Sequence, residues 1–359
     1  MGDKEKIVIF GATGHVASNL ALDLARNYEV IAVGRRKSDN GFFEDYKIPY
    51  FSVDVGRSES FERLPLGGVF AVLHFAGALP AYQVKYDAQE YISSIVQGTF
   101  NVLEYARRVQ AKRFVFPQTL CDIDYLFGSP TPIPSDAVRR APLCGDHAMY
   151  VICKNAAVDM IEHYYQVHGI KRFIFRMSRI YQYLPDPYQW MDYERRLVSD
   201  RYMIYRAMQG LPLEIWGDPT RKLETMCIRD LEQMIRCALT ANCDGGLYNV
   251  GSGGTSLEDR IRGIAEVFSP KETPSQIVYR PEKPNGHQFV LDYSKATREL
   301  GYHPQYTWKK YLIDFKHEME LQRFRRLRGV ESDYFNIDSM SKVGRVGRAG
   351  IPSQSLGNL

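Results

Sequence analysis

Two side chains that could exchange a proton with a substrate stand four residues apart in the segment 145–168. Tyr150 and Lys154 fall on one face of the helix that this segment predicts, one turn from each other. An ammonium beside a phenol lowers the pKa of the phenol, and a bound cationic ring would lower it further, so Tyr150 could trade a proton near neutral pH. The alternative is a chance Tyr-x-x-x-Lys pair, which many helices contain. The elements that precede the pair decide between these interpretations.

A glycine-rich turn near the start of the chain predicts a binding site for a dinucleotide. The apolar run 7–10 meets Gly11, and residues 16–24 then carry apolar side chains at helical spacing. Gly11 permits the sharp turn, and Gly14 lets a pyrophosphate approach the N–H groups and the positive dipole end of the helix. A structural turn in another kind of α/β protein is the alternative. The βαβ pattern that follows the turn favours the dinucleotide.

A basic cluster stands at the end of the second predicted strand, residues 29–33. An NAD site usually places an acidic residue there, about 20 residues past the glycines, for the ribose hydroxyls. This sequence has Arg35 and Arg36 instead, followed by Lys37. Guanidinium groups suit a 2′-phosphate, which predicts NADP rather than NAD. If the cluster is only a solvated basic turn, the NADP preference does not follow.

Two further strands end where a cofactor would lie. Residues 52–55 predict a third strand that ends at Asp54, whose carboxylate could accept a hydrogen bond from the adenine amine. Residues 69–75 form an apolar run that is typical of a buried parallel strand, and it stops at Ala76 and Gly77. These two small residues leave room for a cofactor.

The fifth predicted strand, residues 114–116, completes the pattern. Thr119 lies just beyond its carboxyl end, where open parallel sheets bind their ligands, and the hydroxyl could orient a substrate. Strands and helices thus alternate, which predicts an α/β fold with a doubly wound parallel Rossmann sheet. Because the glycine turn and the threonine precede them in this order, Tyr150 and Lys154 are interpreted as catalytic.

The composition excludes several classes of protein. The chain has 359 residues, of which 45% are hydrophobic and 25% charged, and a net charge of +4. That charge is too small to indicate nucleic acid binding. No run of about 18 apolar residues occurs, so we expect no membrane span, no signal peptide and a cytoplasmic location. The six cysteines form no CxxC pair and show no zinc-ligand spacing with histidines, so we expect reduced thiols and no metal.

The order of these landmarks resembles the extended short-chain dehydrogenase/reductases, specifically their nucleotide-sugar epimerase/dehydratase branch. The resemblance covers residues 6–319. Its landmarks are Gly11-x-x-Gly14-x-x-Ala17, Asp54, residues 74–77, Gly98-Thr99, residues 114–119, Tyr150-x-x-x-Lys154, Arg176, residues 211–217, residues 248–253 and residues 292–304.

The resemblance implies a role for each residue of the predicted site. In this family the tyrosine is the acid and base, the lysine holds the nicotinamide ribose and polarises the tyrosine, and the serine or threonine binds a sugar hydroxyl. Tyr150, Lys154 and Thr119 take these positions. The implied cofactor is NAD(P), and the predicted cofactor-binding residues are Gly11, Gly14, His15, Val16, Arg35, Arg36, Asp54, Val55, Phe75, Ala76, Gly77, Tyr150, Lys154 and Met177.

Some residues depart from the family's pattern on the substrate side. The 4,6-dehydratases follow the threonine with Asp-Glu, whereas Thr119 is followed by Leu120 and Cys121, so we do not expect dehydration. Arg179 stands where an asparagine normally contacts the substrate diphosphate, and an arginine there could grip phosphate more firmly. The arginine that the family places after residue 217 is displaced here to Arg221 or Lys222. The predicted substrate-binding residues are Thr119, Arg179, Arg221, Lys222 and Arg280.

The resemblance also implies a division of the chain. Residues 1–178, with about 225–251, are predicted to form the dinucleotide-binding domain, and residues 179–224 and 252–320 a smaller C-terminal α/β lobe for the substrate. Residues 321–359 are a basic extension, which predicts a solvated or disordered tail, with contact to a second subunit or an acidic partner as the alternative.

Three functions remain open at this point. The first is an NAD(P)-dependent nucleotide-sugar epimerase that works through a transient keto-sugar by reversible hydride transfer. The second is a keto-sugar-nucleotide reductase that consumes NADPH, which Arg35 and Arg36 would favour. The third is a cofactor-binding module without catalysis. The predicted ligand is a nucleotide-diphosphate sugar, and the resemblance implies a homodimer built on the helices 91–109 and 147–168.

Overall fold

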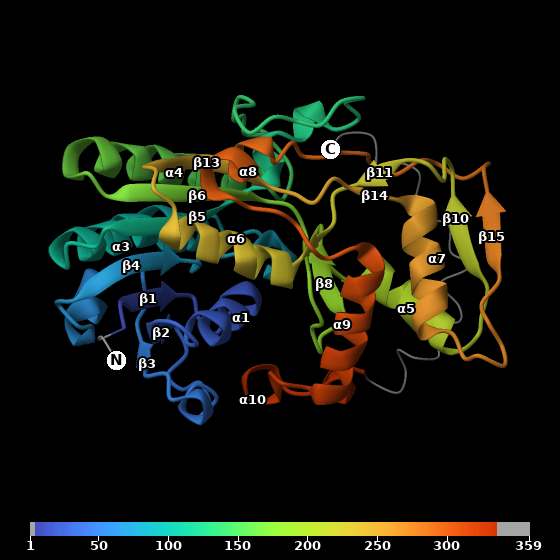
Figure 1. The fold of residues 1–359 in the computed structure, drawn as a ribbon, viewed down its shortest axis with the longest axis horizontal. Helices are drawn as coiled ribbons and strands as arrows, with labels where there is room; N and C mark the ends of the chain where they lie inside the picture. The colour runs from blue at the N-terminus through green and yellow to red at the C-terminus, as the bar shows by residue number, and fades with distance from the viewer. Residues whose placement is uncertain (1–3, 336–359) are drawn as a thin grey trace.

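The computed structural model describes residues 4–335 and is built on a parallel sheet of seven strands (Figure 1). The strand order is β13-β6-β5-β4-β1-β2-β3. Every neighbouring pair in the sheet is parallel, as the alternation of strands and helices predicts. The strands are β1 (Lys6–Phe10), β2 (Glu29–Gly34), β3 (Tyr50–Ser52), β4 (Val69–His74), β5 (Arg113–Thr119), β6 (Lys171–Met177) and β13 (Gly245–Val250).

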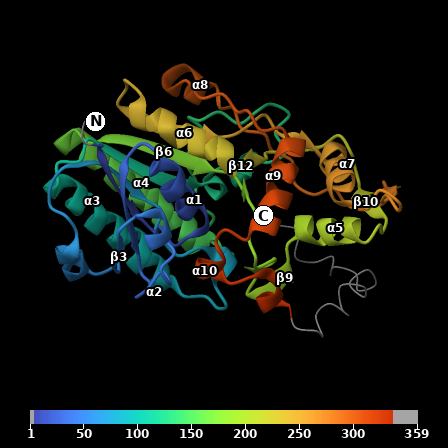
Figure 2. The same ribbon diagram turned by 60° about the horizontal axis from the view of Figure 1, so that its bottom comes forward.

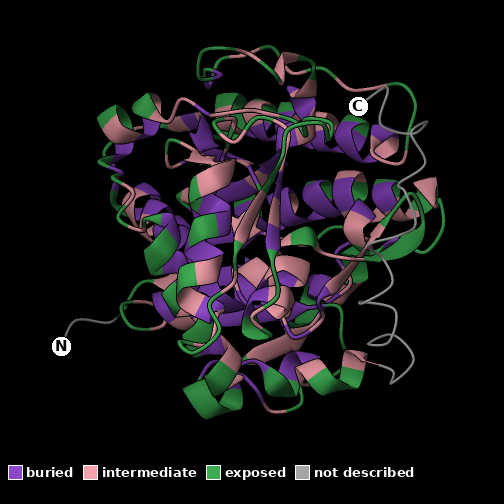
Figure 3. Ribbon diagram, turned by 90° about the vertical axis from the view of Figure 1, so that its right-hand side faces the viewer, coloured by how far each residue is buried: buried purple, intermediate pink, exposed green. Residues whose placement is uncertain are grey.

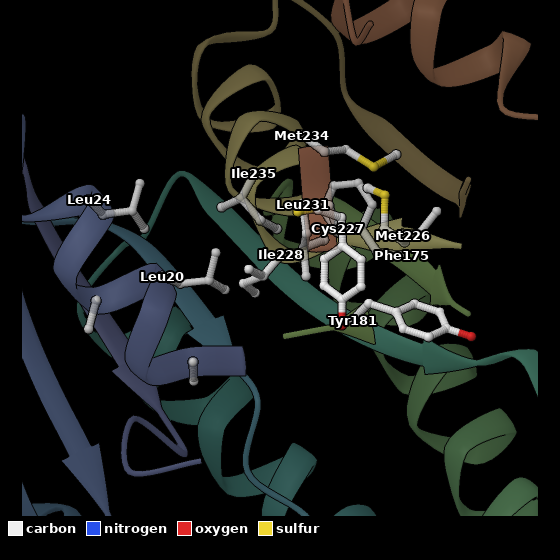
Figure 4. Close-up of a cluster of buried hydrophobic side chains, with 14 of the residues drawn as sticks. Leu20, Leu24, Phe175, Tyr181, Met226, Cys227, Ile228, Leu231, Met234 and Ile235 are labelled. Atoms are coloured by element: carbon white, nitrogen blue, oxygen red, sulfur yellow. The ribbon is translucent and has the colours of Figure 1, made fainter. Parts of the chain in front are cut away.

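Helices cover both faces of this sheet, because the buried strands carry apolar side chains on both sides. In β1, Ile7 and Ile9 belong to one core cluster, and Val8 and Phe10 belong to the other. The first cluster lies under α1 (His15–Leu24) and α6 (Ile228–Thr240), whose leucines and isoleucines meet in Figure 4. The second lies under α3 (Gly98–Arg108) and α4 (Ala148–His168).

A second lobe packs at the carboxyl end of the sheet (Figures 1 and 2). Its helices are α5 (Ser199–Met208), α7 (Leu257–Phe268) and α9 (Trp308–Leu321), whereas α8 (Ser294–Leu300) packs against β13 and α6 of the first lobe (Figure 1). Its parallel pair is β10 (Leu213–Trp216) with β15 (Ile277–Arg280), and its hairpin is β8 (Tyr188–Met191) with β9 (Glu194–Leu197). Four two-residue strands form two further pairs, β7 (Ile180–Tyr181) with β12 (Met226–Cys227) and β11 (Lys222–Leu223) with β14 (Thr255–Ser256). The short helix α2 (Ala88–Tyr91) precedes α3 in the first lobe.

Figure 3 shows that buried residues gather between the helices, while exposed residues follow the outer surfaces. Within residues 4–335, no helix has both the length and the apolar character needed to cross a bilayer.

Two sequence predictions about these elements are wrong in their bounds. The third strand is Tyr50–Ser52 and not 52–55, because pairing with β2 ends at Gly34 opposite Ser52. The helix predicted over 91–109 begins at Ala88 and contains a π-helical segment, Ile92–Gln97, before α3. The side chain of Asp87 caps its start by accepting a hydrogen bond from the Glu90 N–H.

The beginning of the predicted tail is packed against the first lobe instead of being solvated. After α9 the chain turns back to the short helix α10 (Arg325–Arg328), which lies beside α1 in both ribbon views (Figures 1 and 2). Phe324 and Leu327 are buried, and the Phe324 ring lies 5.5 Å from the Phe42 ring. The prediction of a solvated tail is therefore wrong as far as Phe335, and residues 336–359 lie outside the described part of the chain.

Candidate cofactor and active site

A cavity of about 780 Å³ lies between the carboxyl ends of the sheet strands and the second lobe. Every residue that the sequence predicts to bind the cofactor lines it, and so do Thr119 and Arg179. Residues from α5 and α9 form the opposite wall. A cavity of this size at this edge of a parallel sheet suits a dinucleotide together with a second ligand.

The glycine turn has the geometry that a pyrophosphate needs. Gly11 has a φ of +81°, and a Cβ there would lie 2.6 Å from the carbonyl carbon of Phe75. The Gly14 N–H donates to the Gly11 carbonyl oxygen at 2.8 Å, which closes the turn. Gly14 is also the N-cap of α1, and no side chain caps that helix. The N–H groups of its first turn therefore face the cavity as a site for an anion, so these residues fit a dinucleotide.

The two arginines that follow β2 both line the cavity, but their surroundings differ. The Arg35 guanidinium is mostly exposed and lies 3.4 Å from the Glu90 carboxylate. Arg36 donates a hydrogen bond to the carbonyl oxygen of Leu327 in α10. Asp54 accepts a hydrogen bond from the Gly56 N–H at 3.0 Å, which orients its carboxylate at the cavity wall.

The three predicted catalytic residues stand together on the sheet side of the cavity. Thr119 is the last residue of β5, while Tyr150 and Lys154 are in the first two turns of α4. All three are buried. The Lys154 ammonium donates to the Pro117 carbonyl oxygen at 2.7 Å and lies 5.9 Å from the centroid of the Tyr150 ring. Hydroxyl, phenol and amine thus meet in one corner of the cavity.

The acidity of Tyr150 differs from the sequence expectation. Burial raises the pKa of the phenol, Cys121 raises it further, and hydrogen bonding with Thr119 opposes the shift. Burial also lowers the pKa of the Lys154 ammonium to about 7. The expectation that the lysine lowers the phenol pKa is therefore wrong for the protein without ligands, because burial withdraws both groups from water and weakens the charge of the lysine itself.

A buried polar network holds the carboxyl end of β5 in place. The Gln118 amide donates to Asn155 at 2.8 Å and to Asp122 at 3.1 Å, and its oxygen accepts the Thr119 N–H at 3.0 Å. Asp122 in turn accepts from the Arg176 Nε at 2.8 Å, and the side chains of both partners are fully buried. The network ties β5 to α4 and β6, so it sets the position of Thr119 relative to Tyr150.

The opposite end of the cavity carries charge from the second lobe. The Arg179 guanidinium lies 3.8 Å from the Asp200 carboxylate, which also accepts a hydrogen bond from Arg260 at 2.9 Å. Arg179 stacks over the Tyr181 ring at 5.2 Å from its centroid. This wall combines positive charge with aromatic rings, which suits a phosphorylated ligand that also has a flat ring.

Three predicted substrate-binding residues are not brought to the cavity. Arg280 lies on β15, where its guanidinium is 3.1 Å from Glu214 on the paired strand. Lys222 belongs to β11 and is exposed, and Arg221 contacts Asn285 at 3.4 Å. None of Arg221, Lys222 and Arg280 is among the residues that line the described cavity.

Two contacts at the site have no counterpart in the sequence predictions. The Tyr82 hydroxyl lies 2.7 Å from His15 Nδ1 at the start of α1. Arg328 from α10 donates a hydrogen bond to the Gly14 carbonyl oxygen at 2.9 Å. The cluster of arginines at 323–328 was the available signal for the second contact, but its sequence distance from the glycine turn concealed the pairing.

Comparisons with known proteins agree with this geometry. Residues 7–251 match the model of the NAD dependent epimerase/dehydratase family. UDP-glucuronic acid decarboxylase 1 of Arabidopsis thaliana is 25% identical over 310 residues, covering 84% of this chain and 66% of that protein. A dTDP-glucose 4,6-dehydratase of Haemophilus influenzae is 26% identical over 258 residues, covering 67% of this chain and 73% of the relative.

The fold is also shared with solved structures. The crystal structure of UDP-glucuronic acid 4-epimerase from Bacillus cereus in complex with UDP-glucuronic acid and NAD superposes with a TM-score of 0.65. The two chains are 19% identical, and the match covers 88% of this chain and 99% of the other.

Proposed function

Because the chain belongs to the NAD dependent epimerase/dehydratase family, we propose that it is a nucleotide-sugar epimerase with a nicotinamide dinucleotide in the described cavity. One observation carries the proposal. Thr119, Tyr150 and Lys154 meet at one wall of the cavity whose other end holds the glycine turn. The UDP-glucuronic acid and NAD in the Bacillus cereus epimerase support the same ligand classes here.

The residues divide the chemistry as follows. A bound nicotinamide ring supplies an acceptor for a hydride that is later returned to the sugar. Tyr150 takes the proton of a sugar hydroxyl and gives it back after the keto-sugar has rotated to present its other face. The Thr119 hydroxyl orients the sugar. Lys154 has a pKa of about 7, so it can change charge near neutral pH and thereby change the pKa of the Tyr150 phenol beside it.

The replacement Tyr150→Phe tests this assignment. It removes only the phenolic oxygen, so we expect turnover to fall by about 10²- to 10⁴-fold while cofactor affinity is retained. The assay follows interconversion of UDP-, dTDP-, GDP- and CDP-sugars by NMR. Tyr165→Phe is the matched control, since the Tyr165 hydroxyl donates to Asp244 at the far end of the same helix. Undiminished turnover in Tyr150→Phe would refute the proposed acid and base.

A reductase that consumes NADPH is the second candidate, and Arg36 at the ribose end of the cavity favours it. The same residue supports our proposal that NADP is preferred to NAD. Stoichiometry separates the two functions. An epimerase interconverts sugars without net loss of cofactor, whereas a reductase consumes NADPH absorbance continuously with a 4-keto substrate.

We further propose a homodimer that uses the outer faces of α3 and α4. Ile92, Phe100 and Ile152 are exposed apolar side chains on this part of the surface, and a partner would cover them. A monomeric mass by light scattering would contradict the dimer.

We place the protein in the cytoplasm because all six cysteines, which lie within the described residues, are free thiols.

A further inference from the structure

The aromatic ring of Phe116 lies against the ammonium of Lys154. Phe116 belongs to β5 and is completely buried in the core cluster under α3 and α4. The Lys154 Nζ is 4.3 Å from the centroid of the Phe116 ring, which is closer than its 5.9 Å from the centroid of the Tyr150 ring. The face of an aromatic ring carries negative charge in its π electrons and attracts a cation at such a distance. The Phe116 ring is therefore placed to stabilise the charged form of the lysine.

The ammonium of Lys154 has little else to compensate its charge. The residue is buried, and it donates a hydrogen bond to the carbonyl oxygen of Pro117. Among residues 4–335 no carboxylate forms an ion pair with it. Burial penalises a charge that is neither hydrated nor paired, and it lowers the pKa of Lys154 to about 7. A charge in such surroundings depends strongly on the contacts that remain, and the Phe116 ring is one of them.

The other titratable groups around this corner leave the lysine without a counter-ion. They are Cys153 on α4 itself, His74 on β4, Glu90 and Tyr91 on α2, Glu104 on α3, Cys121 and Asp122 after β5, and Arg176 on β6. The three carboxylates among them are already paired with arginines, namely Glu90 with Arg35, Glu104 with Arg107 and Asp122 with Arg176. Burial, together with the charge of Lys154, lowers the pKa of His74 to about 3. The imidazole, 5.7 Å from the Phe116 ring, is thus uncharged at neutral pH and does not oppose the attraction.

We infer that Phe116 is a positioning residue for the proposed reaction, whose ring holds a positive charge on Lys154 beside Tyr150 through a cation–π contact. The catalytic part of this inference rests on the proposed function, in which the charge of Lys154 makes the Tyr150 phenol a stronger acid. Without the ring, Lys154 would lose its proton at a lower pH. The phenol would then lack the neighbouring positive charge over part of the neutral pH range.

Two kinds of replacement test the contact in the full chain. Phe116→Leu keeps an apolar side chain but removes the ring, whereas mono-, di- and trifluorinated phenylalanines at the same position keep the shape and weaken the negative charge of the ring face. The titration of Lys154 is followed by NMR of ¹³C-labelled lysine, with Lys154→Met for assignment. In Phe116→Leu we expect its midpoint to lie about 0.5 to 1.5 pH units below that of the natural chain, as for the loss of a desolvated cation–π contact. In the fluorinated series the midpoint should fall with each added fluorine.

Phe114→Leu is the matched control, because Phe114 lies on the same strand and is buried in the same core cluster. It should leave the midpoint of Lys154 unchanged. In the pH profile of turnover, the limb on which activity falls as Lys154 loses its proton should move to lower pH in Phe116→Leu and stay in place in Phe114→Leu. Thermal unfolding identifies a variant that fails to fold, and the fluorinated series, which keeps the size of the ring, then carries the comparison.

The outcomes separate this inference from the proposed function. A midpoint that does not move in the fluorinated series would overturn the cation–π contact, since the ring would then only fill space, and this holds even if Phe116→Leu raises the midpoint by admitting water. A lowered midpoint with an unmoved pH profile of turnover would overturn the role of Phe116 in the reaction. If the natural chain converts no nucleotide sugar, the proposed function fails instead, whereas the NMR titration still decides whether Phe116 stabilises the charge of Lys154.

Discussion

Replacing Lys154 by methionine should change how the stability of the cofactor-free protein depends on pH. Burial lowers the pKa of Lys154 from 10.5 to about 7, and the residue is 4% exposed, so water screens this effect little. Between these two values the unfolded chain binds a proton at Lys154 that the folded chain has released. The free energy of unfolding of the natural protein therefore rises with pH over this window.

The size of the effect follows from the same shift. The slope is about 1.4 kcal/mol per pH unit in the middle of this window and smaller near pH 7 and pH 10, where Lys154 is partly protonated in one of the two states. Lys154 therefore adds about 3 kcal/mol to the free energy of unfolding between pH 7 and pH 10. Lys154→Met lacks this contribution. It also leaves the Pro117 carbonyl oxygen without the donor at 2.7 Å, but that loss does not depend on pH. The stability of the variant minus that of the natural protein should thus fall by about 3 kcal/mol from pH 7 to pH 10.

Urea unfolding followed by tryptophan fluorescence, repeated at each pH, measures this difference. Subtracting the free energy of unfolding of the natural protein from that of the variant at each pH removes the contributions that other titrating groups make equally to both proteins. Lys271→Met is the control, because Lys271 is exposed and its replacement should give a difference that stays level with pH. Parallel stability curves for Lys154→Met and the natural protein would refute the argument that burial neutralises this lysine.

Two further replacements test the turn and the polar network. Gly11→Ala should destabilise the fold by about 1–3 kcal/mol and weaken cofactor binding, because the φ of Gly11 is +81° and the new Cβ would lie 2.6 Å from Phe75. Gly67→Ala is the control, since nothing lies within 4 Å of a Cβ at that position. Thermal unfolding measures the stability of both variants, and a cofactor titration measures their affinity. Asp122→Asn should lower the free energy of unfolding in urea by about 3–5 kcal/mol, because it leaves the buried Arg176 without its carboxylate. A decrease below about 1 kcal/mol would contradict a structural role for the pair.

The parts of the site that depend on local pattern could be predicted from the sequence. The apolar run before Gly11 and the helical spacing after it become β1 and α1 at nearly the expected residues. Tyr150 and Lys154 share a face of α4 because four residues separate them, whatever the surroundings. These features need no information about distant parts of the chain, which explains their success.

Features that depend on distant contacts could not be predicted. The direction of the Tyr150 pKa shift is set by burial under residues from several elements, which the spacing to Lys154 does not reveal. The extent of β3 follows from its pairing with β2. The contact of Arg328 with Gly14 joins residues 314 positions apart, so the arginine cluster could only be interpreted as a basic extension.

The substrate side shows the same limit and indicates where selectivity arises. Arg280 is held by Glu214 on the outer strand pair, so its charge is already compensated away from the cavity. In contrast, Asp200 is shared by Arg179 and Arg260, so one carboxylate faces two guanidiniums and these three groups together keep one positive charge at this wall. Because a diphosphate is an anion that favours such a wall, we expect Arg179, which stands where the family has an asparagine, to determine how the substrate is held.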